Sequence, residues 1–158
     1  MFSKFQIKPK DLKTKEKEIV SDIINGKEQL IKTLEFSALK NIDNQEVIIT
    51  FLQSEFDTSV KETCTYISKE LKWISKNINS LKNYFAKDSK DVFEYLANKD
   101  QSFFKEETIL NSIVINNINF LNSSSFEIAF GAPTLINDNQ ISFVVDPQLR
   151  EKLLVTHS

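Results

Sequence analysis

Few residues in this sequence have side chains suited to covalent or metal chemistry. Among its 158 residues there is one cysteine and one histidine. Cys64 lies within an apolar pattern, so we interpret it as a small buried hydrophobic residue. His157 lies next to the C-terminus, and a Cys–His pair would require the tail to fold back onto that pattern. A single cysteine excludes an internal disulfide, and these counts exclude zinc sites built from several Cys and His residues. We therefore expect no metal and no cofactor.

Acidic residues are the remaining candidates for catalysis. Glu127, Asp138 and Asp146 could converge as the carboxylates of a hydrolase, although nothing in their spacing places them together. Gly26 and Gly131 are the only glycines, and they are too few for a phosphate-binding loop or a dinucleotide-binding fingerprint. There is no serine nucleophile elbow either. The sequence thus favours a protein that is not an enzyme, with a carboxylate-dependent hydrolase as an alternative.

Length and charge limit the partners that we expect. A chain of 158 residues is typical of one domain, here 1–158, with residues 1–10 forming a short strand or a flexible arm. The formal net charge is −2 and Arg150 is the only arginine, which argues against nucleic acid as a partner. Apolar runs are too short to cross a bilayer, and no signal-peptide pattern is present. We expect a cytoplasmic protein that does not bind membranes.

The pattern that organises the chain lies in residues 57–85. Apolar residues recur there at alternating spacings of four and three, and we call this set the apolar ridge: Val60, Cys64, Ile67, Leu71, Ile74, Ile78, Leu81 and Phe85. This spacing is one face of an α-helix, and it predicts a single long amphipathic helix over residues 58–86. Ser59 and Glu62 form a capping box at its start. We expect the ridge to pack on the chain's own sheet, because the flanking positions lack the regular opposed charges that select a partner helix.

The N-terminal third of the chain predicts a helix followed by a hairpin. Asp11 can cap a helix that runs to about Asn25 and is stopped by Gly26, and residues 28–32 could add a further helical turn. The period then changes from helical to alternating. Residues 34–37 and 47–52 read as strands joined by a polar turn, which predicts an antiparallel hairpin.

The C-terminal half predicts short helices and then strands. Helices are expected from about residue 88 to 98 and from residue 102 onward, and Phe103 and Phe104 belong to the second. Strands are expected at residues 113–120, 126–130 and 141–145, followed by a terminal helical turn or two. The predicted fold class is α+β: an antiparallel sheet, made of the N-terminal hairpin and the C-terminal strands, packed against one long amphipathic helix and shorter helices.

Two sets of residues are candidates for binding a partner. Tyr66, Trp73 and Tyr84 form a second line on the predicted long helix, beside the apolar ridge. They either pack under the shorter helices or remain exposed as anchors for a partner, because Trp and Tyr are common at interfaces. Leu135 and Ile136 are bulky residues in a turn-like segment, and they either fold back onto the core or contact a partner.

The order of elements, with Phe126-Glu-Ile-Ala-Phe-Gly131 and Gln140-Ile-Ser-Phe-Val-Val-Asp146 near its end, resembles that of small bacterial α+β proteins of unknown function. Some of their relatives look like immunity proteins of polymorphic toxin systems. The similarity covers about residues 34–145. It implies a non-enzymatic module that binds another protein, a toxin in its most concrete form. The alternatives are a homo-oligomeric structural or assembly subunit that uses the long helix 58–86, and the hydrolase considered above.

Overall fold

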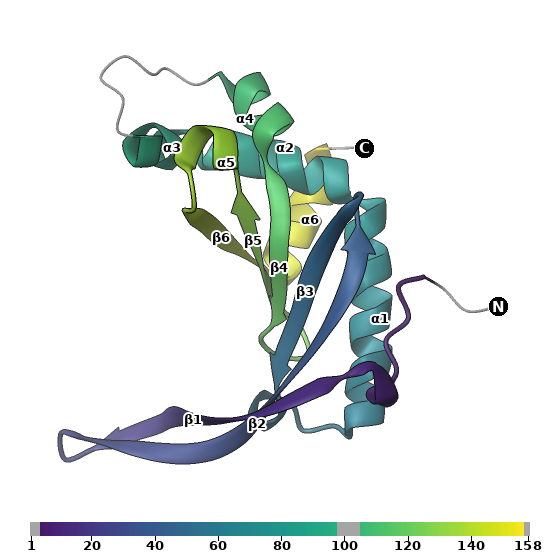
Figure 1. Cartoon of the computed structure of the whole chain (residues 1–158), viewed down its shortest axis with the longest axis vertical. Helices are drawn as coiled ribbons and strands as arrows, with labels where there is room; N and C mark the ends of the chain where they lie inside the picture. The colour runs from purple at the N-terminus through teal and green to yellow at the C-terminus, as the bar shows by residue number, and fades with distance from the viewer. Residues whose placement is uncertain (1–3, 98–104, 157–158) are drawn as a thin grey trace.

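The computed structural model describes residues 4–97 and 105–156 of the chain (Figure 1). Within these ranges, six strands form one mixed sheet whose spatial order follows the chain order. The strands are β1 (Lys13–Ile24), β2 (Lys27–Ile42), β3 (Gln45–Leu52), β4 (Val114–Phe120), β5 (Phe126–Gly131) and β6 (Gln140–Val145). The α-helices are α1 (Val60–Lys76), α2 (Ile78–Asp88), α3 (Lys90–Ala97), α4 (Glu106–Ser112), α5 (Pro133–Ile136) and α6 (Pro147–Thr156), and short 3-10 helices occupy Pro9–Asp11 and Gln53–Glu55. The predicted α+β class is confirmed.

The sheet is mostly antiparallel, with one exception at its centre. β3 and β4 pair in parallel, with Ile49 opposite Ile118 and Phe51 opposite Phe120. The prediction of a wholly antiparallel sheet is wrong at this pair. A parallel pair needs a long crossover because the chain must return to the end of the sheet where the first strand began. Residues 53–113, with helices α1 to α4, provide that crossover.

The helix that the sequence predicts before residue 26 is a strand in the structure. β1 pairs antiparallel with β2 along its whole length, from Lys13 to Ile24. Asn25 and Gly26 have φ values of 54° and 76°, the two positive φ values that a type I′ hairpin turn requires. Both the helix over 11–25 and the helical turn at 28–32 are therefore wrong.

The single long helix predicted over residues 58–86 is also wrong, because it is broken in two at Asn77. This residue has φ −109° and ψ 18°, and its side-chain amide donates to the carbonyl oxygen of Trp73 at 2.8 Å. Figure 1 shows α2 turning away from the axis of α1 at this point. The N-terminal cap is present, since Ser59 Oγ accepts from the amide of Glu62 at 3.1 Å.

The apolar ridge stays continuous across the break and lies against the sheet. Seven of its eight residues are buried and Val60 is partly buried. The side chain of Cys64 is 1% exposed, as expected for a small core residue. Phe85 stacks on the Phe130 ring with centroids 4.3 Å apart. The ridge is thus used inside the molecule.

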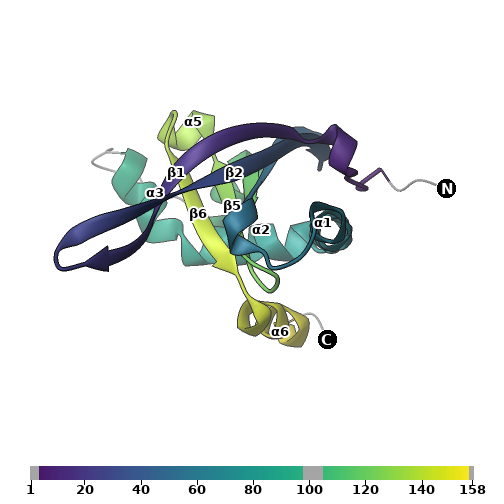
Figure 2. The same cartoon turned by 90° about the horizontal axis from the view of Figure 1, so that it is seen from below.

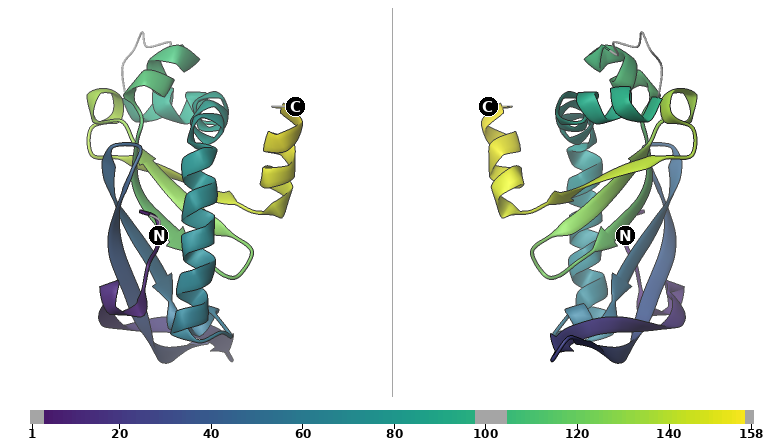
Figure 3. Two further views of the ribbon diagram at one scale, coloured as in Figure 1. Left: turned by 90° about the vertical axis from the view of Figure 1, so that its right-hand side faces the viewer. Right: turned by 90° about the vertical axis from the view of Figure 1, so that its left-hand side faces the viewer.

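Among the residues that the structure describes, the helices leave one face of the sheet open. Figure 3 shows α1 behind the sheet when the open face is towards the viewer, and in front of the sheet from the opposite side. The described part of the N-terminal segment, residues 4–10, is packed instead of extending as an arm. Phe5 and Ile7 are buried there, and the amide of Ile7 donates to Ser68 Oγ on α1 at 2.8 Å.

The short helix and the strands predicted in the C-terminal half are present as α3, β4, β5 and β6. Of the next predicted helix, residues 105–112 are described, and α4 carries the buried Ile109. Residues 102–104, including Phe103 and Phe104, lie outside the described residues, and so does His157. Among the described residues, no helix has the length and apolarity needed to cross a membrane.

Candidate protein-binding surface

The aromatic residues that the sequence offered as partner anchors are half-buried under α6 and its neighbours. The guanidinium carbon of Arg150, on α6, lies 4.5 Å from the ring centroid of Trp73, and Arg150 also pairs with Glu70 on α1. Trp73 makes an edge contact with Phe126, and Tyr66 makes one with Phe120. These contacts bury part of each side chain, and the role of the three residues as partner anchors stays a prediction.

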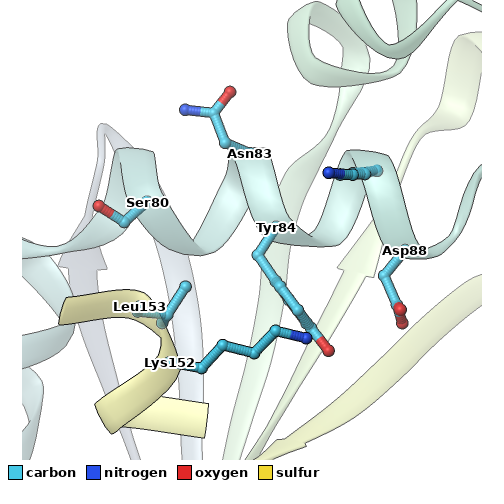
Figure 4. A pocket seen from close by; sticks show the side chains of 7 residues that line it. Ser80, Asn83, Tyr84, Asp88, Lys152 and Leu153 are labelled. Atoms are coloured by element: carbon cyan, nitrogen blue, oxygen red, sulfur yellow. The ribbon is translucent and has the colours of Figure 1, made fainter. Parts of the chain in front are cut away.

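Tyr84 lies at a surface pocket between α2 and α6. The pocket has a volume of about 430 Å³ and is lined by Ser80, Asn83, Tyr84, Lys87, Asp88, Lys152 and Leu153. Figure 4 shows the side chain of Lys152 reaching from α6 towards the ring of Tyr84 on α2, and the Lys152 amine lies 5.3 Å from the ring centroid. Burial raises the pKa of the Tyr84 phenol, and Asp88 and Asp146 raise it further. These effects favour the neutral form of the phenol.

The second candidate set, Leu135 and Ile136, lies on α5. Ile136 is fully buried in the core, and Leu135 is half-buried and packs against it. Both residues therefore fold back onto the chain itself, which is one of the two alternatives given above. The short helix α5, which connects β5 to β6, turns their side chains towards the core.

The three carboxylates of the hydrolase alternative are not brought together. Asp138 precedes β6 and Asp146 follows it, so the length of a six-residue strand, about 20 Å, separates them. Asp146 accepts from the amide of Leu149 at 2.8 Å and caps α6. Glu127 lies on β5, opposite Asn119 and Val144. In the described part of the chain, no group of three or more His, Cys, Asp or Glu side chains could hold a metal ion.

The surface that is left uncovered is the far end of the β1–β2 hairpin, residues 18–32, which we call the arm. Figure 1 shows the arm leaving the sheet and ending away from the helices, and Figure 2 shows its strong twist. Its exposed large apolar residues are Val20, Ile23, Ile24, Leu30 and Ile31. Ile23 is 65% exposed and Leu30 is 56% exposed. Side chains of this kind are ordinarily buried, and a cluster of them marks a surface that contacts something.

The open face of the sheet has a different composition. Leu39 and Ile48 are exposed there as one cross-strand pair, but the neighbouring positions are polar. Thr50 Oγ1 and Asn119 Oδ1 are 2.9 Å apart on adjacent strands. A sheet with one polar face in water and one apolar face on the core is the usual antiparallel arrangement, so this face needs no cover. The arm does not follow that rule, because apolar residues occupy both of its faces.

The two edges of the arm differ in charge. Within the arm, β1 carries two acidic residues, Glu18 and Asp22, whereas β2 carries charges of both signs, Lys27, Glu28 and Lys32. On the other side, β1 is the only strand in the described residues that pairs with residues 27–34 of β2. The β2 edge of the arm therefore presents backbone amides and carbonyls that have no strand beside them.

Sequence reasoning missed the arm because it read β1 as a helix. Ile19, Ile23 and Ile24 have helix-like spacing, and the bulge between Val20 and Asp22 shows that β1 does not keep the strict alternation by which a strand is recognised. The signal that could have revealed the hairpin is Asn25-Gly26, the dipeptide most characteristic of a two-residue β-turn.

Comparisons of the chain with protein-family models, with curated proteins and with solved structures found no significant match.

Proposed function

We propose that this protein is a binding module that works by holding another protein chain on its arm. The observation that carries the proposal is the exposure of five large apolar side chains on a two-stranded ribbon. An isolated ribbon of two strands is only marginally stable in water, and further strands or a packing partner are needed to stabilise it. A protein chain beside the arm would bury these side chains and pair with the free β2 edge.

Binding to an exposed sheet edge is an established mode of protein recognition. Main-chain hydrogen bonds supply affinity, and side chains on alternating positions supply specificity. The arm fits this mode because it combines an unpaired edge with apolar residues on both faces. Immunity-type neutralisation of a toxin is the most concrete form of the proposal when the partner is a different protein.

The alternative of an assembly subunit that uses residues 58–86 loses its basis, because the apolar ridge is packed in the core of its own chain. The hydrolase alternative is weakened in the same way, since Asp138 and Asp146 lie at opposite ends of β6. Neither point argues against a partner held by the arm.

The test is an affinity capture from the native host with three forms of the tagged protein. The arm variant carries Ile23→Lys and Leu30→Lys, and the control carries Leu39→Lys on the open face, where Leu39 is 53% exposed. We expect at least one protein chain, which can include untagged copies of this chain, to be retained by the wild type and by the control. We expect the arm variant to lose it.

A captured protein that inhibits growth when produced alone should be neutralised by co-production of the wild type and not of the arm variant. That result would establish the immunity form. A captured protein that does not inhibit growth would rule out the immunity form and leave the binding module. If the arm variant retains every partner that the wild type retains, the proposed function is wrong.

A further inference from the structure

The free edge of β2 in the arm has a sequence that is complementary to itself. Its residues are Lys27, Glu28, Gln29, Leu30, Ile31 and Lys32, and Thr33 follows. Two copies of one strand related by a two-fold axis pair antiparallel, with a single residue at the centre facing its own copy. The choice of that central residue fixes every other pair.

With Leu30 at the centre, the apolar and charged side chains of one face meet suitable ones, and on the other face Gln29 meets Ile31. Leu30 faces Leu30 of the second copy, and Glu28 faces Lys32 of the second copy twice, by symmetry. Directly opposed pairs of opposite charge, and of apolar side chains, stabilise a sheet, whereas like charges destabilise it. The neighbouring registers are worse. Centring on Gln29 places Leu30 against Glu28, and centring on Ile31 places Leu30 against Lys32.

The pairs inside one chain extend this complementarity across four strands. Val20 lies opposite Leu30, and Glu18 lies opposite Lys32. In the paired arms, one face would therefore carry a row of four aliphatic side chains, Val20 and Leu30 from each copy. The next row would place Lys32 between Glu18 of its own chain and Glu28 of the second copy.

The β1 edge is unsuited to the same pairing. Centring on Lys17 or Glu18 places a charge against its own copy, and centring on Ile19 places Glu16 against Asp22. Charged side chains along an edge strand are a known protection against edge-to-edge pairing. The arm thus has one protected edge and one edge that matches itself.

We propose that the arm's occupant is a second copy of this chain, paired along residues 28–32 of β2 with Leu30 at the two-fold axis. The inference rests on the proposed function, because it names the chain that the arm holds. The contact is smaller than the standard protein–protein interface, so we expect a dimer whose population depends on concentration.

The central test uses Leu30→Cys, with Gln29→Cys as a matched control one residue away. Directly opposed Cβ atoms lie about 5 Å apart, so a cysteine at 30 needs only a small adjustment to form a disulfide with its copy. The two copies of residue 29 are offset along the strands, with Cα atoms more than about 7 Å apart, which is too far for a disulfide. The native Cys64 is 1% exposed. On mild oxidation we expect at least about tenfold more covalent dimer from Leu30→Cys than from Gln29→Cys. Equal yields would overturn the proposed register.

A second test reverses the charges. Glu28→Lys places a lysine against Lys32 of the second copy and should raise the dimer Kd by about tenfold, because two opposed ion pairs become repulsive. Lys32→Glu should do the same. A mixture of these two variants restores both pairs and should form a mixed dimer close to the wild type in affinity. The matched control is Glu46→Lys, an exposed charge reversal beside the β2–β3 turn, which should leave the Kd unchanged.

Sedimentation at about 1 µM and about 100 µM, which bracket a micromolar Kd, measures each dimer. If the wild type is monomeric at both concentrations, the pairing proposed here is wrong. Capture of a different protein that is lost in the arm variant would in that case leave the proposed function standing. If neither a dimer nor arm-dependent capture is found, both fail.

Discussion

β2 belongs to two regions of the molecule that treat their apolar side chains in opposite ways. The described residues outside the arm form the rest of the molecule, which we call the body. There, towards the C-terminal end of β2, Phe36 and Ile42 are buried in the core between the sheet and the helices. In the arm, Leu30 is 56% exposed on the same strand. The pairing with β1 continues from the arm past Phe36 to Ser37, so the difference between Leu30 and Phe36 arises from what covers the strand and not from its secondary structure.

The large apolar side chains of the body are mostly covered by other parts of the chain, whereas those of the arm are exposed. The body has stacked aromatic rings, such as Phe85 against Phe130 with centroids 4.3 Å apart, and a polar open face that water can solvate. The arm has apolar residues on two faces and a β2 edge without a neighbour. In this account, the body supplies the stability of the fold and the arm supplies its binding.

The largest expected difference between the regions concerns the core. Phe85→Ala removes a ring that contacts Phe93, Phe130 and Phe143, and it should lower the free energy of unfolding by about 3–5 kcal/mol. Leu30→Ala in the arm should change it by no more than about 0.5 kcal/mol when the protein is dilute, because an exposed side chain loses little packing. Urea unfolding of both variants measures the difference. Similar losses would show that the arm is part of the core.

A smaller effect on the free energy of unfolding is expected where α6 packs against α1. Arg150→Ala removes the cation stacked on Trp73 and the partner of Glu70, and should cost about 2 kcal/mol of unfolding free energy. Arg150→Lys keeps the charge but loses the planar stacking group, so its loss should be intermediate. Chemical denaturation monitored by Trp73 fluorescence tests both. If Arg150→Lys is as damaging as Arg150→Ala, the planar geometry of the guanidinium is what matters and not its charge.

The smallest expected effect separates the two turns of β2. Gly26 has φ 76° in the arm and Asn44 has φ 62° in the body, a conformation that costs other L-residues about 1 kcal/mol. Gly26→Ala should speed amide exchange only within the arm and leave global unfolding unchanged. Asn44→Ala should lower global stability by about 1 kcal/mol. If Gly26→Ala also lowers global stability, the arm unfolds together with the body.

Much of the body could be predicted from the sequence, because its patterns are regular over long stretches. The apolar ridge and the alternation in residues 126–130 determine which faces are buried. The break at Asn77 could not be predicted, since an asparagine at that position also fits the polar side of a continuous helix. The parallel pairing of β3 and β4 depends on where the crossover brings the chain back, which no local pattern encodes.

The arm could not be predicted for a different reason. Apolar residues in a sequence normally indicate burial, and nothing in the pattern of residues 11–32 distinguishes Ile23 and Leu30 from core residues. Whether they are covered depends on which elements reach them, and none of the described helices does. Tyr66 and Trp73 illustrate the converse, because only the placement of α6 reveals that these candidate anchors are partly buried.

The most direct test of the contrast between arm and body is amide hydrogen exchange at about 1 µM and about 100 µM protein, on either side of a micromolar Kd. The account predicts that residues 28–32 of β2 exchange more slowly at the higher concentration, because a second chain then covers their edge, while β4 and β5 exchange at the same rate at both. If residues 28–32 also exchange at the same rate at both concentrations, no second copy covers the edge and the account is contradicted.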